Sequence, residues 1–388
     1  DYKNKIGELA EYPFPKEIDA PLPHEIITDT RSPTTDMWFL PLVGKNFDGH
    51  SFIEKALTTG KAKGAFCQKE AFKKIPTKLQ KKIIVVADTL LCLQKIATMN
   101  REKNPQAILF AMTGSVGKTT TRNMLHSILK ETGKPFLSTQ KNYNNEIGLP
   151  LTLLQLKPEH QFILLEMGAK LIGDIKQLVE IALPDYTACL NVGSSHLEIF
   201  KTRDNIYSTK LEILNKTEQY QKGIVFGDDN KLLQLAKKKD PHCYSFGEGP
   251  KNDARLLNKK VSEQKLNVTY QIFDSLFDVS FSSFHEAYPI NGLAASFLAH
   301  LAKISVETIQ KGLAAFCPTD SRFRSYCYKN KVIIDDSYNA SPESMESGIK
   351  TVNKLYPEKK ISYILGDMLE FGEKSEELHQ KVGKFCTL

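Results

Sequence analysis

The 388-residue sequence contains no apolar run long enough to cross a bilayer, and its first residues lack the basic-then-apolar order of a secretory signal. Its seven cysteines are odd in number, widely scattered and never spaced as Cys-x-x-Cys. That pattern argues against a disulfide framework and against a zinc ribbon. We therefore expect a cytoplasmic protein without membrane insertion, working in a reducing compartment.

The sequence has no strong excess of charge of one sign. The net charge is +7, but lysines and glutamates are interspersed, as in residues 370–377. Short basic clusters such as residues 237–239 are more typical of solvated surface than of a nucleic-acid-binding stripe. Internal repeats and low-complexity segments are also missing, so we expect two or three globular domains and no nucleic-acid partner. We also expect a monomer, and a modest positive field would suit an anionic, nucleotide-linked substrate.

One glycine of the standard phosphate-binding loop is missing as well. That loop has a glycine six positions before its lysine, where this sequence has Met112. The other parts are present, because an apolar run at residues 107–112 predicts a buried strand, and Gly114-x-x-Gly117-Lys118-Thr119 then opens an amphipathic helix. At such a helix start, free N–H groups bind phosphate oxygens, Lys118 can reach the terminal phosphates and Thr119 can ligate Mg²⁺. The sequence predicts an ATP or GTP site, although so short a pattern also occurs in ordinary strand-to-helix turns.

The distribution of apolar runs predicts an α/β protein. Short strands and a helix within residues 26–88 indicate a small α/β domain, and residues 253–283 are rich in strand-forming residues. Between them, apolar runs alternate with amphipathic helical segments, which is typical of a doubly wound parallel sheet. These runs are residues 107–112, 162–165, 186–192 and 223–226. A third unit begins near residue 317, with strands expected at 331–334 and 361–365, and stops after little more than one βαβ unit.

Polar residues follow several of these expected strands. Ligands of open parallel sheets bind beyond the carboxyl ends of the strands, so such positions carry weight. Glu166 ends one expected strand and His196 follows another. A single residue of this kind is more often structural, but the two together, beside a phosphate loop, favour a metal site. Asp335 and Asp336 end a strand of the third unit and could orient a nucleophile or a ribose.

Two further features stay open on chemistry alone. Lys210 lies in an expected helical segment, residues 206–214, and is by default a surface lysine. The amide-rich residues 142–146 are by default a turn, although they could also bind sugar hydroxyls or a peptide.

A series of motifs, in order and over nearly the whole chain, resembles the Mur ligase family. The motifs are Thr113-Gly-Ser-Val-Gly-Lys-Thr-Thr-Thr121, Asn142-Tyr-Asn-Asn-Glu-Ile-Gly-Leu-Pro150, Glu166-Met-Gly168, Val192-Gly-Ser-Ser-His-Leu-Glu198, Asp335-Asp-Ser-Tyr-Asn-Ala340 and Leu365-Gly-Asp-Met-Leu-Glu370. Thr28-Asp-Thr-Arg31 and residues 44–50 also resemble the uridine-nucleotide domain of the members that use D-alanyl-D-alanine. The resemblance implies three domains: a UDP-substrate-binding α/β domain (1–88), a central P-loop ATPase domain with a parallel sheet (89–317), and a truncated, Rossmann-like C-terminal domain with dipeptide and nucleotide contacts (318–388).

The resemblance implies an amide-forming reaction of peptidoglycan synthesis. ATP would phosphorylate the terminal carboxylate of UDP-N-acetylmuramoyl-tripeptide, and the amine of D-alanyl-D-alanine would attack the acyl phosphate. Several negative charges meet at the γ-phosphoryl group, so Lys118, the loop N–H groups and Mg²⁺ would neutralise them. The motifs do not distinguish diaminopimelate from lysine as the third peptide residue.

The resemblance also implies roles for individual residues. The implied catalytic residues are Lys118, His196, Lys210 and Arg322. The implied ATP contacts are Gly114, Ser115, Val116, Gly117, Lys118, Thr119, Thr120, Asn291, Arg322 and Asp336. The implied substrate contacts are Asp29, Thr30, Arg31, Asn142, Asn144 and Asn145. The implied ligands of two Mg²⁺ ions are Thr119, Glu166, His196 and Lys210, the last as a carbamate, which requires a neutral and desolvated amine.

Some positions depart from the family pattern. Ala287 and Tyr288 replace a usual His-Asn pair near the adenine, Ser321 replaces the glycine before the arginine, and Ser341 replaces an asparagine. One alternative is another Mur or folylpolyglutamate-type ligase, against which residues 142–150 and 335–340 argue. The other is a nucleotide-gated binding module without ligase chemistry.

Overall fold

The computed structural model describes residues 2–13, 19–32, 34–140, 142–193, 197–217, 219–262, 265–319, 321–329 and 331–386. The chain forms two compact units. The first comprises Asp1–Gln106, Thr139–Glu159 and Glu180–Ala182, and the second comprises Ala107–Ser138, His160–Val179 and Leu183–Leu388.

The first unit is built on a four-stranded parallel sheet with the strand order β1-β2-β5-β6. Its strands are β1 (Ile26–Ile27), β2 (Trp38–Phe39), β5 (Gly64–Gln68) and β6 (Ile83–Val86), and β3 (Val43–Gly44) pairs with β4 (Phe47–Asp48) in a hairpin. Its helical elements are α1 (Tyr2–Gly7), η1 (Pro23–Glu25), η2 (Gly49–Phe52), α2 (Ile53–Leu57), α3 (Lys69–Phe72), α4 (Thr77–Gln80), α5 (Thr89–Glu102) and α7 (Gly148–Leu153). Every residue of β6 is buried, as expected of a strand that is apolar on both faces. The prediction of a small α/β domain is confirmed.

Helix α5 ties residues from two parts of the sequence together within the first unit. Its N-cap residue Asp88 accepts a hydrogen bond from the N–H of Leu91 at 2.8 Å. The buried amide of Asn100 donates to the carbonyl oxygens of Leu153 and Leu156 at 2.8 and 3.0 Å, which holds α7 against α5. The contacts thus group α5 with the N-terminal residues, whereas our sequence-based boundary lies at residue 88; the domain boundaries remain a prediction.

The second unit contains a nine-stranded sheet with the order β15-β14-β13-β12-β11-β10-β7-β9-β8. Its strands are β7 (Ile108–Thr113), β8 (Phe136–Ser138), β9 (Phe162–Glu166), β10 (Tyr186–Cys189), β11 (Lys222–Phe226), β12 (Tyr244–Gly247), β13 (Ala254–Ser262), β14 (Lys265–Ile272) and β15 (Ser275–Phe281). Neighbours from β8 to β13 pair in parallel, and β13, β14 and β15 form an antiparallel meander. This confirms the predicted parallel sheet and the strand-rich segment. Because β9 and β10 flank β7 in parallel, the carboxyl ends of these strands meet at one edge.

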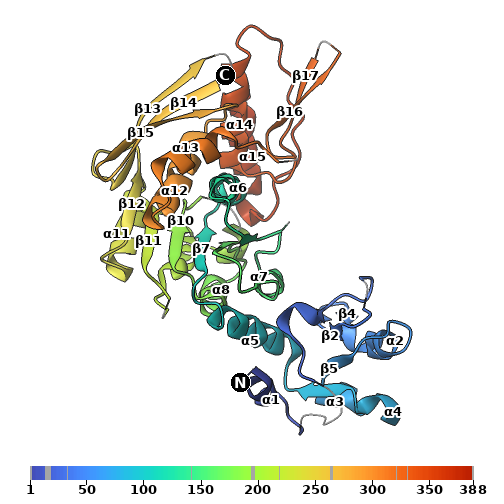
Figure 1. Ribbon diagram of the computed structural model, residues 1–388. Coiled ribbons are helices and arrows are strands. Elements are labelled where there is room, and N and C mark those ends of the chain that lie inside the picture. Colours follow the sequence, from blue (N-terminus) through green and yellow to red (C-terminus); the bar gives the residue numbers. More distant parts are fainter. Residues whose placement is uncertain are drawn as a thin grey trace. The chain divides into compact units, whose positions relative to one another are not determined.

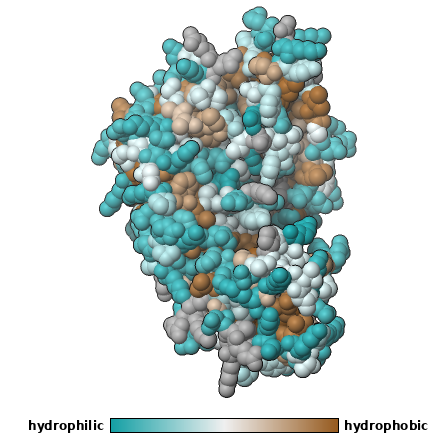
Figure 2. Space-filling view, turned by 45° about the vertical axis from the view of Figure 1, so that its right-hand side comes forward, coloured by the Kyte–Doolittle hydropathy of each residue, from teal (hydrophilic) through white to brown (hydrophobic). Residues whose placement is uncertain are grey.

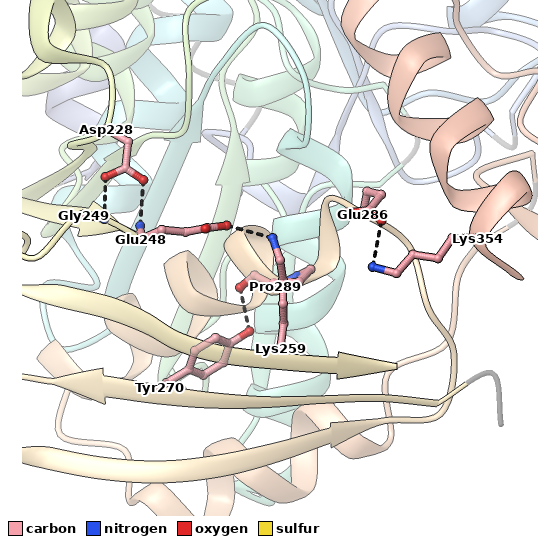
Figure 3. A network of polar contacts seen from close by, with 8 residues as sticks. All are labelled: Asp228, Glu248, Gly249, Lys259, Tyr270, Glu286, Pro289 and Lys354. Atoms are coloured by element: carbon pink, nitrogen blue, oxygen red, sulfur yellow. Dashed lines mark hydrogen bonds and ion pairs between the residues drawn. The ribbon is translucent and has the colours of Figure 1, made fainter. Parts of the chain in front are cut away.

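The second unit also contains helices, several of which pack against this sheet. They are α6 (Lys118–Glu131), α8 (Asp174–Ala182, shared between the units), α9 (Leu197–Phe200), α10 (Arg203–Leu211), η3 (Glu212–Leu214), α11 (Asn230–Lys239), α12 (Tyr288–Leu301) and α13 (Val306–Ala314). Figure 1 shows α12 and α13 lying along the meander, next to α6. The phenol of Tyr270 in β14 donates to the carbonyl oxygen of Pro289 at 2.7 Å, which fixes the first turn of α12 (Figure 3). A Cβ on Gly312 would lie 2.3 Å from Cα of Ile128, so glycine allows α13 to approach α6.

The C-terminal part of the second unit has a small core of its own. It contains a two-stranded antiparallel sheet, β16 (Arg324–Tyr328) and β17 (Lys331–Asp335), followed by α14 (Pro342–Leu355), η4 (Gly372–Lys374) and α15 (Ser375–Phe385). Ile349, Met368, Phe371 and Val382 are buried between these elements. The strand predicted at residues 361–365 is wrong, because this segment has no regular structure and Ile364 is 99% exposed. Within the described residues, β17 pairs with β16 alone, so the apolar segment has no neighbouring ladder that would hold it as a strand.

The surface is mixed in character. Figure 2 shows hydrophilic side chains over much of one face, with hydrophobic ones scattered among them, as is usual for globular proteins. Within the described ranges, no helix combines the length and the apolarity that a membrane crossing requires.

Candidate nucleotide and metal site

The predicted phosphate loop lies between β7 and α6. The loop occupies residues 114–117, and α6 begins at Lys118. Gly117 has a φ of +82°, in the left-handed region that favours glycine, and a Cβ there would lie 2.8 Å from Oδ1 of Asn291. Glycine therefore lets the loop approach α12, and it brings the predicted ATP contact Asn291 to the start of α6. The free N–H groups of this first helical turn are suited to bind phosphate oxygens.

The side chain of Lys118 folds back over the loop. Its Nζ donates to the carbonyl oxygens of Gly114 and Ser115 at 2.6 and 3.3 Å. Burial lowers the pKa of Lys118, the carboxylate of Glu166 opposes this shift, and the guanidinium of Arg322 adds to it. The structure thus brings Lys118, Glu166 and Arg322 within range of one another's charges, as their predicted roles around a triphosphate require.

Glu166 is a buried carboxylate at the end of β9, with 2% of its surface exposed. Its Oε2 accepts a hydrogen bond from Oγ1 of Thr119 at 3.1 Å, and its Oε1 lies 3.0 Å from Nε of Arg122 in an ion pair. Burial lowers the pKa of Arg122, whereas Glu166 raises it and Arg322 lowers it further. The two predicted metal ligands, Thr119 and Glu166, are therefore adjacent. The guanidinium of Arg122, which the sequence did not indicate, contacts the same carboxylate.

The donor set at this position fits Mg²⁺. A hydroxyl and a carboxylate are oxygen ligands, and Mg²⁺ commonly takes few protein ligands while it keeps waters and binds substrate phosphates. Among the described residues, no group of three or more His, Cys, Asp and Glu side chains forms a complete metal cage. The predicted ligand His196 lies outside the described residues.

Lys210 is buried in α10, with 2% of its surface exposed, so the default interpretation as a surface lysine is wrong. Burial lowers the pKa of Lys210 to about 7, and the charge of Lys118 lowers it in addition. The neighbouring Cys189, Asp174 and Glu212 oppose this shift. A neutral amine is consequently accessible near neutral pH, in a place that faces the phosphate-loop lysine.

The segment that carries Lys210 is tied to the segment that follows Glu166. Glu212, in η3, accepts hydrogen bonds from the N–H groups of Gly173 and Lys176 at 2.9 and 3.0 Å. These N–H groups belong to the start of α8, where the helix dipole stabilises a carboxylate. Glu212 therefore fixes the end of α10 relative to the loop after β9.

Arg322 and Asp336 lie where the chain enters and leaves the β16–β17 hairpin. The guanidinium of Arg322 lies 3.9 Å from the centre of the Tyr338 ring, and Oδ1 of Asp336 accepts a hydrogen bond from the N–H of Phe323 at 3.0 Å. Desolvation raises the pKa of Asp336 to about 6, although the Phe323 N–H and Arg322 lower it. The two predicted nucleotide contacts thus lie together at the base of the β16–β17 hairpin.

The other carboxylate of that pair has a local role. Oδ1 of Asp335 accepts a hydrogen bond from the N–H of Ser337 at 3.0 Å, and Oδ2 accepts one from the hydroxyl of Ser321 at 3.0 Å. Ser321 has a φ of +57°, which explains why glycine is the usual residue before this arginine. Asp335 thus braces the turn, and the nucleotide contact implied for Asp336 remains a prediction.

The predicted substrate residues belong to the first unit. Arg31 forms a bidentate pair with Asp29, with Nε–Oδ1 at 3.0 Å and Nη2–Oδ2 at 2.7 Å, and this pair lowers the pKa of the Asp29 carboxyl. Thr30, between them, is partly exposed. In the amide-rich segment, Oδ1 of Asn145 accepts a hydrogen bond from the N–H of Gly148 at 2.9 Å and so braces the start of α7.

Asn142 and Asn144 share a turn in the same segment. The N–H of Asn144 donates to the carbonyl oxygen of Asn142 at 2.8 Å, and Asn142 is exposed while Asn144 is partly buried. The segment therefore has the turn that its composition predicts, and the roles of its side chains in substrate binding remain a prediction.

A separate cavity of about 550 Å³ lies beyond β11 and β12. It is lined by Asp228, whose carboxylate accepts hydrogen bonds from the N–H groups of Glu248 and Gly249 at 2.7 and 2.9 Å (Figure 3). The amide of Asn252 donates to the same carboxylate at 2.8 Å. The oxygens of Asp228 are thus occupied by hydrogen bonds from residues 248–252, which join the loop after β11 to the loop after β12. The role of Asp228 in this cavity is therefore structural.

Three residues of the site escaped the sequence analysis: Arg122, Glu212 and Asn191. Asn191 lies just beyond the carboxyl end of β10, and its side chain contacts the phosphate loop. The reasoning that found Glu166 at the end of β9 could therefore have found it. Arg122 and Glu212 lie within helical segments among other charged residues, where no spacing distinguishes them.

Comparisons with known proteins agree with this geometry. Residues 112–299 match the family model described as "Mur ligase middle domain", and residues 321–387 match "Mur ligase, glutamate ligase domain". The chain is 34% identical over 362 residues to the UDP-N-acetylmuramoyl-tripeptide–D-alanyl-D-alanine ligase of Bacillus subtilis, covering 93% of this chain and 77% of the relative.

Two solved structures are similar over most of the chain. The crystal structure of MurF from Acinetobacter baumannii superposes with a TM-score of 0.85 at 32% identity, covering 94% of this chain and 78% of that one. MurF ligase from Thermotoga maritima in complex with ADP gives a TM-score of 0.82 at 30% identity, covering 95% of this chain and 83% of that one.

Proposed function

Because this chain belongs to the Mur ligase family, we propose that it joins D-alanyl-D-alanine to UDP-N-acetylmuramoyl-tripeptide with the use of ATP, as a step of peptidoglycan synthesis. The observation that carries the proposal is the convergence of Lys118, Thr119, Glu166 and Arg322 at the start of α6. The ADP in the similar Thermotoga maritima structure supports ATP as the nucleotide.

The reaction has two steps, and the charges of the site suit both. In the first step the terminal carboxylate of the tripeptide attacks the γ-phosphoryl group, and the bond between that group and ADP breaks. The N–H groups at the start of α6, Lys118 and Arg322 would offset the negative charge that gathers there. In the second step the amine of the dipeptide attacks the acyl carbon and phosphate leaves, so that an amide bond forms and the amine loses its proton.

The nucleotide would lie along the start of α6, in contact with residues 114–120. Asn291, which adjoins Gly117, would contact the adenine, and Asp336 would face the nucleotide from the C-terminal part of the unit. Asp29, Thr30 and Arg31 would bind the uridine nucleotide, and Asn142, Asn144 and Asn145 would bind the muramoyl peptide. These assignments rest on the family resemblance, residue by residue.

Thr119 and Glu166 would hold Mg²⁺, together with His196 and the modified Lys210, and two ions are expected. When bound, Mg²⁺ supplies a Lewis acid for the phosphoryl oxygens. Arg122 contacts the Glu166 carboxylate on the side away from Thr119 Oγ1, and so it would keep that carboxylate in place.

Lys210 would act as a carbamate. Its neutral amine adds to dissolved CO₂, so that an N–C bond forms, one proton is released and an anionic carboxylate results. The depressed pKa of about 7 supports this modification, because only the uncharged amine is a nucleophile toward CO₂. An ammonium group in the same place would oppose the metal ion electrostatically.

The test is a phosphate-release assay with ATP, Mg²⁺ and combinations of the two acceptor substrates. A ligase releases phosphate only when the UDP-tripeptide and D-alanyl-D-alanine are both present, whereas a nucleotide-gated binding module binds ATP without this dependence. Mass analysis of the product, with diaminopimelate- and lysine-containing tripeptides offered separately, identifies the preferred third residue. We also propose that the reaction takes place in the cytoplasm and that the enzyme acts as a monomer, which sedimentation at working concentrations checks.

A further inference from the structure

The phosphate loop is held by one side chain from the neighbouring strand connection. Oδ1 of Asn191 accepts hydrogen bonds from the N–H groups of Ser115 and Val116, both at 3.0 Å. Its Nδ2 donates to the carbonyl oxygen of Val116 at 2.9 Å. One amide thus contacts both sides of the Val116 residue, using its acceptor and its donor at once.

Backbone contacts from the same segment add to this connection. The N–H of Ser115 also approaches the carbonyl oxygen of Asn191 at 3.3 Å, and the N–H of Gly193 donates to Oγ of Ser115 at 2.8 Å. A Cβ on Gly114 would lie 3.1 Å from Cβ of Leu190, so the loop follows the end of β10 closely.

These contacts divide the loop into two parts. The N–H groups of Ser115 and Val116 are already hydrogen-bonded to Asn191, whereas those of Gly117 to Thr120 open α6, and Gly117 has no side chain that could cap them. The second part is therefore the part that can offer N–H groups to phosphate oxygens. The first part sets the direction in which the loop enters the helix.

We propose that Asn191 is a positioning residue for the nucleotide phosphates. This sequence lacks the early glycine of a standard phosphate-binding loop, and the amide of Asn191 takes over the task of fixing the shortened loop in a phosphate-binding shape. An amide suits this position because it is neutral. A carboxylate would face the Val116 carbonyl oxygen and would repel the phosphates. The inference rests on the proposed function, because it presupposes that a nucleotide binds at α6.

The test compares Mg·ADP binding by calorimetry in the whole protein and in three variants. Asn191→Ala removes the contacts, and Asn191→Asp keeps the size and the acceptor Oδ1 but replaces the Nδ2 donor by a second oxygen of an anionic carboxylate. Asn100→Ala is the matched control, because the side-chain amide of Asn100 also hydrogen-bonds to backbone groups, donating to two carbonyl oxygens, but lies in the first unit. Melting curves without nucleotide show whether each variant folds.

We expect both Asn191 variants to raise the dissociation constant of Mg·ADP about tenfold or more, while Asn100→Ala leaves it unchanged even where it lowers the melting temperature. In the ligation assay, the KM for ATP should rise by a similar factor, with the KM values of the UDP-tripeptide and the dipeptide within about twofold of the original. A merely structural role would lower stability without this selective effect on the nucleotide.

The inference is overturned if the wild-type protein binds Mg·ADP and both folded Asn191 variants bind it equally well. If Asn191→Ala does not fold, the isosteric Asn191→Asp decides the question. A wild-type protein that does not bind Mg·ADP would overturn the proposed nucleotide site, and this inference with it, so the two failures give different results.

Discussion

Replacing Glu166 by glutamine should separate stability from activity at the centre of the site. The carboxylate lies 3.0 Å from the Arg122 guanidinium and accepts a hydrogen bond from Thr119 at 3.1 Å. Two unit charges at that separation attract by about 5 kcal/mol at an effective dielectric constant of about 20. A glutamine oxygen retains part of this attraction, so we expect Glu166→Gln to lower the free energy of unfolding by about 3 kcal/mol, near the lower end for a broken buried pair.

The loss of activity should be larger than the loss of stability explains. Glutamine is a poor ligand for Mg²⁺, and it leaves the cations Lys118, Arg122 and Arg322 close together without the carboxylate that now adjoins them. We expect kcat to fall at least about a hundredfold. Urea unfolding and Mg²⁺-dependent phosphate release measure the two effects separately.

The double variant Glu166→Gln/Arg122→Met tests the reasoning. If the instability arises from a buried guanidinium that has lost its carboxylate, a neutral side chain at position 122 should restore most of the lost stability but none of the activity. A double variant no more stable than Glu166→Gln, or a fully stable single variant, would refute the assignment of this pair as an electrostatic unit.

The remaining predictions concern two lysines. Lys118→Ala should lose ATP turnover, by about 3 kcal/mol or more in the transition state, and keep its melting temperature. Lys130→Ala, on the exposed face of the same helix, should keep both ATP turnover and melting temperature. Lys210→Ala should lose ligation activity and regain part of it when acetate is added, because acetate can occupy the position of the carbamate. As a control, acetate should not restore the activity of Lys118→Ala. Full activity of Lys210→Ala without acetate would contradict the carbamate. In CO₂-free buffer, Lys210→Met should be more stable than the wild type, by more at pH 6 than at pH 9. The pKa of Lys210 is depressed to about 7 from 10.5, so its burial cost is greatest below pH 7 and declines as the pH rises toward 10.5, which urea unfolding at both pH values measures.

Local sequence pattern predicted the site residue Glu166, which follows an apolar run, but not Lys210, which lies within a helix. The apolar run before Gly114 and the carboxylate after the next run predicted β7, β9 and the adjacency of Thr119 and Glu166, because parallel strands place their carboxyl ends together. Lys210 could not be placed from local pattern, since a buried lysine in a helix has the same spacing as an exposed one. Only the family resemblance indicated its role.

Two errors of the local analysis have a common physical cause. The segment 361–365 is apolar and β-branched enough for a strand, yet within the described residues it has no ladder partner, and strand formation depends on a neighbour that the segment itself does not encode. Asn191 has the strand-end position that could have indicated it, but its importance lies in three hydrogen bonds to a loop that is far away in the sequence. Local pattern predicts elements, whereas partners across the sheet decide what each element does.

The charges around α6 indicate why this site binds an anion. In addition to burial, the charge of Arg322 lowers the pKa of Lys118 and of Arg122, and the charge of Lys118 lowers the pKa of Lys210. Glu166 opposes the pKa shifts of Lys118 and Arg122, Asp336 adjoins Arg322, and Asp174 and Glu212 oppose the pKa shift of Lys210. A triphosphate brought to the N–H groups of α6 would add negative charge beside Lys118, and conversion of Lys210 to a carbamate would turn a cation into an anion that can bind Mg²⁺. The same cations would therefore attract the phosphates of a nucleotide and, through Lys118, favour the neutral amine of Lys210 that carbamylation requires.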